Sequence, residues 1–178
     1  MKIALIGYGK MGKAIEAIAI SQGHEIVLKI SSSNLSDFTE ENLRKADVAI
    51  EFTNPHSAKT NLLQCFKAGV PVVCGSTGWL ADIQEVTDAC YAANGGFLYA
   101  SNFSVGVNIF FALNRHLAAL MNQQNEYDVS IEEIHHTQKK DAPSGTAITI
   151  AEQVLASLTR KKSWVNHEAI NPEELAII

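Results

Sequence analysis

Short apolar runs alternate with helical patterns through the first hundred residues of the chain. The runs cover residues 2–6, 25–30, 46–52, 70–74 and 97–100. Between them, apolar residues recur at helical spacing, for example Leu62, Leu63 and Phe66. Strands that alternate with helices and are joined by short loops predict a parallel sheet with right-handed crossovers. We therefore expect an α/β fold with a doubly wound parallel sheet in this part of the chain.

The composition narrows the possible partners. With 178 residues, 47% of them hydrophobic, the chain can bury a sizeable core in one or two domains. A net charge of −5 gives no electrostatic reason to expect nucleic acid or an anionic membrane as a partner. No apolar run approaches the length that spans a bilayer, and the first run is too short for a signal peptide. Cys65, Cys74 and Cys90 form no CxxC pair, so we expect buried, reduced thiols in a cytoplasmic protein.

A glycine-rich turn follows the first apolar run and precedes a helical pattern. Gly7, Gly9 and Gly12 form a GxGxxG pattern in the context that a dinucleotide fingerprint requires. The first glycine allows a tight turn, the second lets the backbone approach a pyrophosphate, and the third permits close packing of helix on strand. The amides at the helix N-terminus then provide donors and partial positive charge for the phosphates. The turn favours a Rossmann-like nucleotide site over a merely glycine-rich loop.

The end of the second run bears on the choice of cofactor. An acidic residue that binds the ribose hydroxyls is expected there, about 20 residues after the glycines. The chain instead has Lys29 followed by Ile30 and three serines, and Asp37 comes several residues too late. Without the carboxylate, serines and a lysine can bind a 2′-phosphate, which favours NADPH over NADH. A solvated serine loop remains the other interpretation.

Two polar turns follow the third and fourth runs. Thr53, Asn54 and Pro55 follow one run, and residues 75–78 (GSTG) follow the other. Both turns fall at the carboxyl edge of the predicted sheet, where open α/β sheets bind ligands. Ordinary strand-to-helix turns are the alternative for each of them. Trp79 either packs over the edge of the cofactor or anchors the turn as a buried side chain.

The pattern changes after residues 101–106. A longer helical pattern covers 107–121, and an alternating pattern predicts a strand over 128–134. We place a domain boundary here, with a dinucleotide-binding domain at 1–103 and a smaller α+β domain at 104–178. The second domain shows at most two strands, too few for an independent sheet, and the chain stops on an apolar run. We therefore expect the second domain to be truncated.

The segment 135–146 (HHTQKKDAPSGT) concentrates groups that exchange protons. His135 and Lys139 can supply the proton that a reduction needs. His135 and His136 would point to opposite faces if the strand continues through them, so we expect no metal site. Ser144 precedes a helical pattern, and the amides and hydroxyls at such a helix N-terminus can hold a carboxylate. A solvated charged loop is the alternative.

Five blocks of sequence follow one another along nearly the whole chain. They are GYGKMG at 7–12, EFTNP at 51–55, GSTGW at 75–79, ASNFSVGVN at 100–108 and HHTQKKDAPSGTA at 135–147. In these blocks the chain resembles the 4-hydroxy-tetrahydrodipicolinate reductase (dihydrodipicolinate reductase) family, and the last block is the most specific. The resemblance implies NAD(P)H-dependent reduction of 4-hydroxy-tetrahydrodipicolinate to tetrahydrodipicolinate in the diaminopimelate pathway of lysine biosynthesis. It also implies a small cyclic dicarboxylate substrate and, for a full-length chain, a homotetramer.

The resemblance further implies roles for individual residues. His135 matches the proton donor and acceptor, and Lys139 matches the proton donor. The substrate-binding positions are His136, Ser144, Gly145 and Thr146. The cofactor-binding positions are Gly7, Tyr8, Gly9, Lys10, Met11, Gly12, Gly75, Ser76, Thr77, Ala100, Ser101, Asn102 and Phe103.

Two departures from the family pattern leave questions open. The acid or arginine often found after the second strand is absent, and the family continues beyond Ile178. Two other functions are compatible with the glycine turn. One is a different NAD(P)-dependent dehydrogenase of a small acid, and the other is a nucleotide sensor without catalysis. His135 and Lys139 in the family's order count against the sensor, which would not need them.

Overall fold

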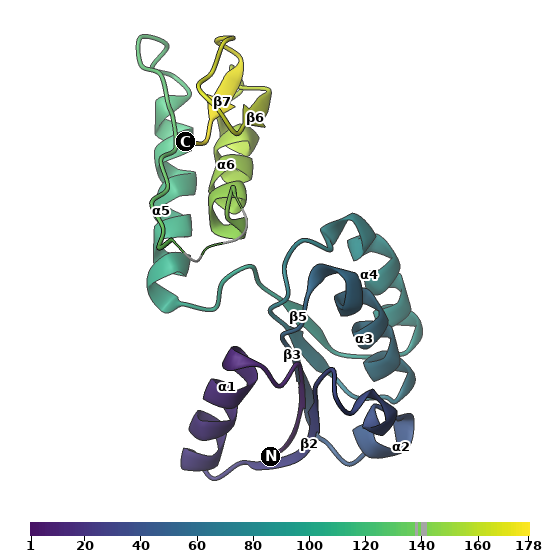
Figure 1. Ribbon diagram of the computed structural model, residues 1–178. Helices are drawn as coiled ribbons and strands as arrows, with labels where there is room; N and C mark the ends of the chain where they lie inside the picture. Colours follow the sequence, from purple (N-terminus) through teal and green to yellow (C-terminus); the bar gives the residue numbers. More distant parts are fainter. Residues whose placement is uncertain (138, 140–141) are drawn as a thin grey trace. The chain divides into compact units, whose positions relative to one another are not determined.

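The computed structural model describes residues 1–137, 139 and 142–178. The chain separates into two compact units, Met1–Ala100 and Ser101–Ile178 (Figure 1).

A five-stranded parallel sheet forms the centre of the first unit. Its strands are β1 (Lys2–Ile6), β2 (Glu25–Ile30), β3 (Val48–Glu51), β4 (Val72–Cys74) and β5 (Phe97–Tyr99). Their order in the sheet is β2-β1-β3-β4-β5, and every neighbouring pair is parallel. The chain runs outward from β1 in one direction and from β3 in the other. The boundary between β1 and β3 is therefore the topological switch point, where open α/β sheets bind ligands beyond the carboxyl ends of the strands.

Helices cover both faces of this sheet (Figure 1). They are α1 (Lys10–Ser21), α2 (Glu40–Leu43), α3 (Pro55–Lys67) and α4 (Ile83–Ala92), with short 3₁₀ turns at Leu35–Asp37 and Leu80–Asp82. On one face, Ile3 and Leu5 pack against Ala19 of α1. On the other face, the larger core includes Ile6, Leu62 of α3 and Val86 of α4. The predicted doubly wound parallel fold is confirmed.

Two details differ from the sequence prediction. The third and fourth strands are shorter than the apolar runs 46–52 and 70–74, because Ala46, Asp47 and Phe52 in the first run and Val70 and Pro71 in the second lie outside the regular ladder. Helix α2 was not predicted. Its four residues are too few to show a period, and it is defined by a cap and one buried contact: Thr39 accepts a hydrogen bond from the amide of Asn42, and Leu43 is fully buried.

The second unit is built on two helices that lie side by side (Figure 1). They are α5 (Val105–Met121) and α6 (Gly145–Ser157), and they are followed by the parallel pair β6 (Ser163–Val165) and β7 (Glu174–Ala176). Small residues line the contact between the helices, where Ala118 of α5 and Ala147 and Ala151 of α6 are buried. Leu158, Leu175 and Ile177 complete this core.

The strand predicted over 128–134 is wrong as a regular element. The segment forms one isolated bridge, between Ile131 and Ile177. It runs beside residues 176–178, at the end of β7 and just beyond it. The amides of Ile131 and Glu133 donate to the carbonyls of Ala176 and Ile178 at 2.9 and 2.8 Å. Apolar alternation reports which side chains are buried, but it does not report how many residues find a ladder partner. The segment is nevertheless held against β7 at the point where the proposed catalytic residues begin.

Candidate functional site

The glycine turn between β1 and α1 needs glycine at two of its three positions. Gly7 has φ of +96°, and a Cβ there would lie 1.9 Å from the carbonyl oxygen of Phe52. A Cβ on Gly12 would lie 2.3 Å from the carbonyl oxygen of Gly7, so the first turn of α1 approaches β1 too closely for a side chain. No atom lies within 4 Å of the corresponding position at Gly9. The backbone at Gly9 is therefore open to a ligand.

Two hollows lie at the carboxyl edge of the sheet and share the residues at the end of β3. One has a volume of about 380 Å³, and its lining includes Gly7, Tyr8, Gly9, Ser31 and Ser32. The other has a volume of about 350 Å³, and its lining includes Gly9, Lys10, Met11, Gly75, Ser76 and Thr77. Phe52, Thr53 and Asn54 line both. All the predicted cofactor-binding residues of the first unit except Gly12 and Ala100 thus border these hollows.

The hollows fit the phosphates and ribose of a dinucleotide. Gly9 is the N-cap of α1, and no side chain caps the helix there. The amides of the first helical turn have no intrahelical acceptors, and the helix dipole adds partial positive charge. A pyrophosphate can approach them because Gly9 has no side chain. The residues present therefore fit a nicotinamide dinucleotide.

A buried carboxylate that the sequence analysis did not single out holds the two turns together. Glu51 is fully buried at the end of β3 and accepts hydrogen bonds from Thr53 Oγ1, Asn61 Nδ2 (3.3 Å) and Cys74 Sγ (3.1 Å). The amide of Thr53 in turn donates to Ser76 Oγ at 2.7 Å. This network connects the turn after β3 to the turn after β4. Burial and the hydrogen bond to Glu51 raise the pKa of the Cys74 thiol, which therefore stays protonated.

Trp79 is a buried anchor. Its side chain is 2% exposed and packs against Phe97 and Tyr99. Its indole Nε1 donates a 2.7 Å hydrogen bond to the carbonyl of Ser76. Of the two interpretations of this residue, the anchor is the one that the structure supports, and it fixes the turn that contains Ser76.

The end of β2 does contain a carboxylate, supplied by helix α1. Glu16 accepts a hydrogen bond from the hydroxyl of Tyr8 and forms an ion pair with Lys29 at 3.2 Å. The ammonium group of Lys29 also lies 5.1 Å from the centre of the Tyr8 ring. The hydrogen bond from Tyr8 and then the contacts with Lys29 lower the pKa of Glu16, so it is ionised at neutral pH. Lys29, which the sequence suggests as a phosphate ligand, therefore already has an anionic partner.

The serine loop after β2 is closed by one asparagine. Asn34 Oδ1 accepts hydrogen bonds from the amide and the hydroxyl of Ser31 at 2.8 and 2.9 Å, and its Nδ2 donates to the carbonyl of Lys29 at 2.9 Å. The loop is thus ordered by its own contacts. Ser31 and Ser32 nevertheless border the larger hollow, where a ribose or its phosphate would lie.

The second unit carries the other group of predicted residues. Ser144 is the N-cap of α6 and accepts a 3.0 Å hydrogen bond from the amide of Ala147, and Gly145 and Thr146 begin the helix. Asn102, which was predicted to contact the cofactor, donates to Thr146 Oγ1 at 3.5 Å within the same unit. Two predicted positions that are 44 residues apart are thus neighbours at the N-terminus of α6. Ser101 is also close, with its hydroxyl 3.1 Å from Thr149 Oγ1.

Glu133 links the two ends of the segment 135–146. Its Oε2 lies 2.9 Å from His135 Nε2, and its Oε1 accepts a 2.7 Å hydrogen bond from the amide of Ser144. Partial burial alone would raise the pKa of Glu133. Hydrogen bonds from Ser144 and His135 outweigh it and hold the pKa below its usual range. The sequence contained one signal for this residue, because positions two apart in an extended segment share a face.

The other polar members of the segment that the structure describes, His136 and Lys139, are not deeply buried. His136 is exposed, Lys139 is half-buried, and the amide of Lys139 donates to the carbonyl of His136 at 3.1 Å. Gln138, Lys140 and Asp141, which contribute to the density of polar groups in the sequence, lie outside the described residues. Among the residues that are described, no three His, Cys, Asp or Glu side chains group as a metal site would require.

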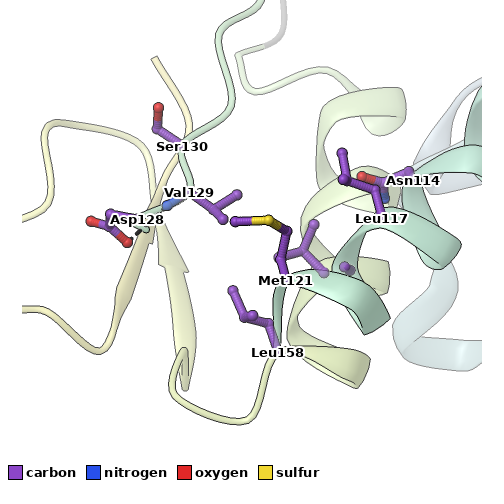
Figure 2. A pocket seen from close by; sticks show the side chains of 9 residues that line it. Asn114, Leu117, Met121, Asp128, Val129, Ser130 and Leu158 are labelled. Carbon is purple, nitrogen blue, oxygen red and sulfur yellow. Dashed lines mark hydrogen bonds between the residues drawn. The ribbon is translucent and has the colours of Figure 1, made fainter. Parts of the chain in front are cut away.

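A third hollow, of about 360 Å³, lies at the C-terminal ends of α5 and α6 (Figure 2). In Figure 2 the side chains of Met121 and Val129 point toward each other across it. Leu117 and Leu158 also line it, together with Asp128. None of the residues predicted to bind substrate or cofactor lines this hollow, which lies at the end of α6 opposite to Ser144.

Within the described parts of the chain, no helix has the length and apolar character needed to cross a membrane.

Two family models together cover nearly all of the chain. The model for the N-terminus of dihydrodipicolinate reductase matches residues 1–103, and the model for its C-terminus matches residues 106–176. The chain belongs to the dihydrodipicolinate reductase family. Enzymes of this family are NAD(P)H-dependent oxidoreductases whose N-terminal domain binds the nicotinamide cofactor.

Individual relatives agree with this membership. The 4-hydroxy-tetrahydrodipicolinate reductase of Christiangramia forsetii is 48% identical over 177 residues, which cover 97% of this chain and 72% of the relative. The enzyme of the same name from Neisseria gonorrhoeae is 35% identical over 145 residues, which cover 82% of this chain and 52% of the relative. This chain therefore matches from about half to about three quarters of the length of these dihydrodipicolinate reductases.

Solved structures share the fold. A dipicolinate-bound dihydrodipicolinate reductase from Paenisporosarcina sp. TG-14 superposes with a TM-score of 0.72 at 24% identity, over 99% of this chain and 78% of that one. An NAD-binding protein from Listeria innocua superposes with a TM-score of 0.56 at 14% identity, over 90% of this chain and 55% of that one. At these identities the likeness concerns the fold.

Proposed function

We propose that the protein reduces 4-hydroxy-tetrahydrodipicolinate to tetrahydrodipicolinate with NAD(P)H, a step of the diaminopimelate pathway to lysine. One observation carries the proposal beyond family membership. His135, a group suited to proton exchange, and Ser144, which caps a helix suited to binding a carboxylate, share the carboxylate of Glu133. If these residues have the roles proposed, a proton-exchanging group lies beside an anion-binding helix end, which is the combination that the reduction of a dicarboxylate needs.

The first unit would hold the cofactor. The amides at the N-terminus of α1 would bind the pyrophosphate through the opening at Gly9, and the turn containing Gly75, Ser76 and Thr77 borders the same edge. The cofactor supplies the hydride that is added to C4 of the substrate ring. We assign residues 1–103 to this dinucleotide-binding domain and residues 104–178 to a domain for substrate binding and assembly.

The second unit would hold the substrate and move the proton. The amides of Gly145 and Thr146 lie in the first turn of α6, where the helix dipole favours an anion such as a substrate carboxylate. His136, which follows His135 in the sequence, is exposed and can bind a second carboxylate. In this proposal Lys139 donates a proton to the reacting substrate, and His135 accepts or returns protons during the reaction. The substrate gains one hydride and one proton in total, and its hydroxyl group leaves as water.

We infer a preference for NADPH. Ser31 and Ser32 border the larger hollow, and the carboxylate at the end of β2, that of Glu16, is already paired with Tyr8 and Lys29. Lysine has three donors, so Lys29 can contact a 2′-phosphate while it remains paired with Glu16. The ratio of kcat/KM for NADPH to that for NADH tests this preference, and a ratio below one contradicts it.

We also propose a cytoplasmic homotetramer. The observation that supports assembly is the apolar surface of α5, where the side chains of Ile109, Leu113 and Leu117 are 57%, 61% and 57% exposed. A contiguous apolar surface of this kind is typical of subunit interfaces. Light scattering of the purified protein measures the assembly, and a monomer at micromolar concentration contradicts it.

Oxidation of NADPH, followed by its absorbance, tests the proposed reaction when the product of the preceding synthase is supplied as substrate. Saturable oxidation supports the proposal. A protein that oxidises NADPH only with another carbonyl or imine compound would be a different small-acid dehydrogenase. Tight NADPH binding without turnover of any such compound would indicate a nucleotide sensor.

A further inference from the structure

The carboxylate of Glu133 has both oxygens engaged by residues assigned to the reaction. Oε2 lies 2.9 Å from His135 Nε2, and Oε1 lies 2.7 Å from the amide nitrogen of Ser144. The side chain of Glu133 is 17% exposed, whereas that of His135 is 41% exposed. Glu133 is therefore the more buried of the two partners.

The backbone holds Glu133 in a fixed place. Its amide donates to the carbonyl of Ile178 at 2.8 Å, and the amide of Ile131 donates to the carbonyl of Ala176 at 2.9 Å. Ile177, which lies between these two carbonyls, is fully buried in the core of the second unit. Glu133 is thus tied to the core two residues before His135, where the segment 135–146 begins.

The chemistry of the two groups determines which ring nitrogen carries the proton. An ionised carboxylate can only accept hydrogen bonds, so His135 must donate through Nε2. In the neutral ring this leaves Nδ1 with a lone pair, available to exchange a proton. A carboxylate behind a histidine fixes ring orientation and tautomer in many catalytic and metal sites. On this basis we propose that Glu133 is the positioning residue of the active site: it fixes His135 as the Nε2–H tautomer and ties it to the N-terminus of α6. The proposal rests on the proposed function.

The second carboxylate oxygen of Glu133, Oε1, connects His135 to the N-terminus of α6. The amide of Ser144 precedes α6 and donates to Glu133, while the hydroxyl of Ser144 accepts from the amide of Ala147. The hydrogen bond to Glu133 therefore fixes the residue that caps the helix. Glu133 thereby connects His135 to the start of α6, where the amides of Gly145 and Thr146 would bind the substrate carboxylate.

Glu133→Gln tests the proposal, with Glu132→Gln as the matched control. Glu132 is the adjacent residue, is exposed, and loses the same charge in the same substitution. Hydrogen bonds to charged groups contribute enough that losing one lowers kcat by about 10- to 100-fold. We expect this loss in Glu133→Gln with the KM for NADPH unchanged within about twofold, because the cofactor is assigned to the first unit. We expect Glu132→Gln to retain wild-type kcat. Equal kcat values for the two variants would overturn the proposal.

The imidazole nitrogen shifts of His135 provide a readout that does not depend on activity. In the wild-type protein, recorded at a pH where the ring is neutral, NMR should show the proton on Nε2. Glu133→Gln should give a mixture of tautomers, while Glu132→Gln should match wild type. A wild-type ring protonated on Nδ1 would overturn the proposal even if Glu133→Gln does not fold. A wild-type Nε2–H tautomer in a protein that turns over none of the tested substrates would refute the proposed function instead.

Discussion

Two substitutions in the glycine turn should have different effects, one on the stability of the protein and the other on its affinity for the cofactor. In Gly12→Ala the new Cβ would lie 2.3 Å from the carbonyl oxygen of Gly7. That atom is backbone, so the first turn of α1 must move away from β1. Overpacking of this kind costs about 1–3 kcal/mol, and a contact this close belongs at the upper end. Alanine recovers about 1 kcal/mol through its higher helix propensity. The net expectation is a loss of about 2 kcal/mol in the free energy of unfolding.

Gly9→Ala is the matched control, because it adds the same methyl group three residues earlier. No atom lies within 4 Å of its Cβ position, and Gly9 has a negative φ of −89°. The poorer N-cap and the reduced freedom of the unfolded chain are opposing effects of similar size, so stability should stay within about 1 kcal/mol. Gly9 borders both hollows, however, and the methyl group would occupy the opening to the helix amides. We expect NADPH affinity to fall by at least about tenfold, the amount that follows from losing a charge-assisted hydrogen bond.

Urea unfolding and titration with NADPH measure the two effects on the same samples. The slope of the urea transition should not change, so the midpoint reports stability directly. Gly12→Ala should lower the midpoint, and Gly9→Ala should lower only the affinity. A Gly12→Ala protein as stable as wild type would refute the steric argument. A Gly9→Ala protein with wild-type affinity would refute the assignment of the dinucleotide to the N-terminus of α1.

Three further predictions concern stability. Glu51→Ala should lower the free energy of unfolding by about 2–4 kcal/mol, because it leaves a cavity and buried donors such as Cys74 without an acceptor; an unchanged urea midpoint would contradict this. Burial and then the charge of Glu51 raise the pKa of Cys65 to about 12, above the value of about 8.5 for an unfolded thiol. The stability that the protonated Cys65 thiol contributes is therefore complete below about pH 8.5 and is lost as the pH rises toward 12. Under reducing conditions the urea midpoint should fall as the pH rises over this range, and it should fall less steeply in Cys65→Ser. Lys161, whose side chain is 1% exposed, lowers the pKa of Asp128, so the contribution of Asp128 is present at neutral pH and lost as the pH falls below its usual range. Asp128→Asn should be less stable than wild type at pH 7 and should converge with it during acid unfolding followed by circular dichroism.

The sequence predicted those parts of the fold that local patterns determine. All five strands of the first sheet were found, because each is a short apolar run between helical patterns. The helix α2 was missed, since four residues show no period and its position depends on Thr39 and Leu43. The strand over 128–134 was wrong, because its pairing is limited to a bridge at Ile131. Apolar patterns in the sequence thus predict a strand well where neighbouring strands pair with its whole length, and poorly where only one residue finds a partner.

Apart from the position of Glu133 two residues before His135, spacing in the sequence does not mark the carboxylates that organise the candidate site. Glu16 contacts a lysine 13 residues away, Glu51 contacts a cysteine 23 residues away, and Glu133 contacts a serine 11 residues away. Each looks like an ordinary acid in the sequence, and only the folded chain brings its partners close. The glycines and the segment 135–146 were visible because their residue types are unusual at any position. Residues that hold other residues in place carry no such signature.

Transfer of deuterium from cofactor to substrate tests the central claim most directly. The protein is mixed with NADPH deuterated at the transferable position of C4 and with 4-hydroxy-tetrahydrodipicolinate, and the tetrahydrodipicolinate formed is analysed by mass spectrometry. We predict one deuterium at C4 of the product ring, at a rate greatly reduced in Lys139→Ala although this variant still binds NADPH. Product without deuterium, or Lys139→Ala with the wild-type rate, would contradict the assignment of hydride and proton transfer to this site.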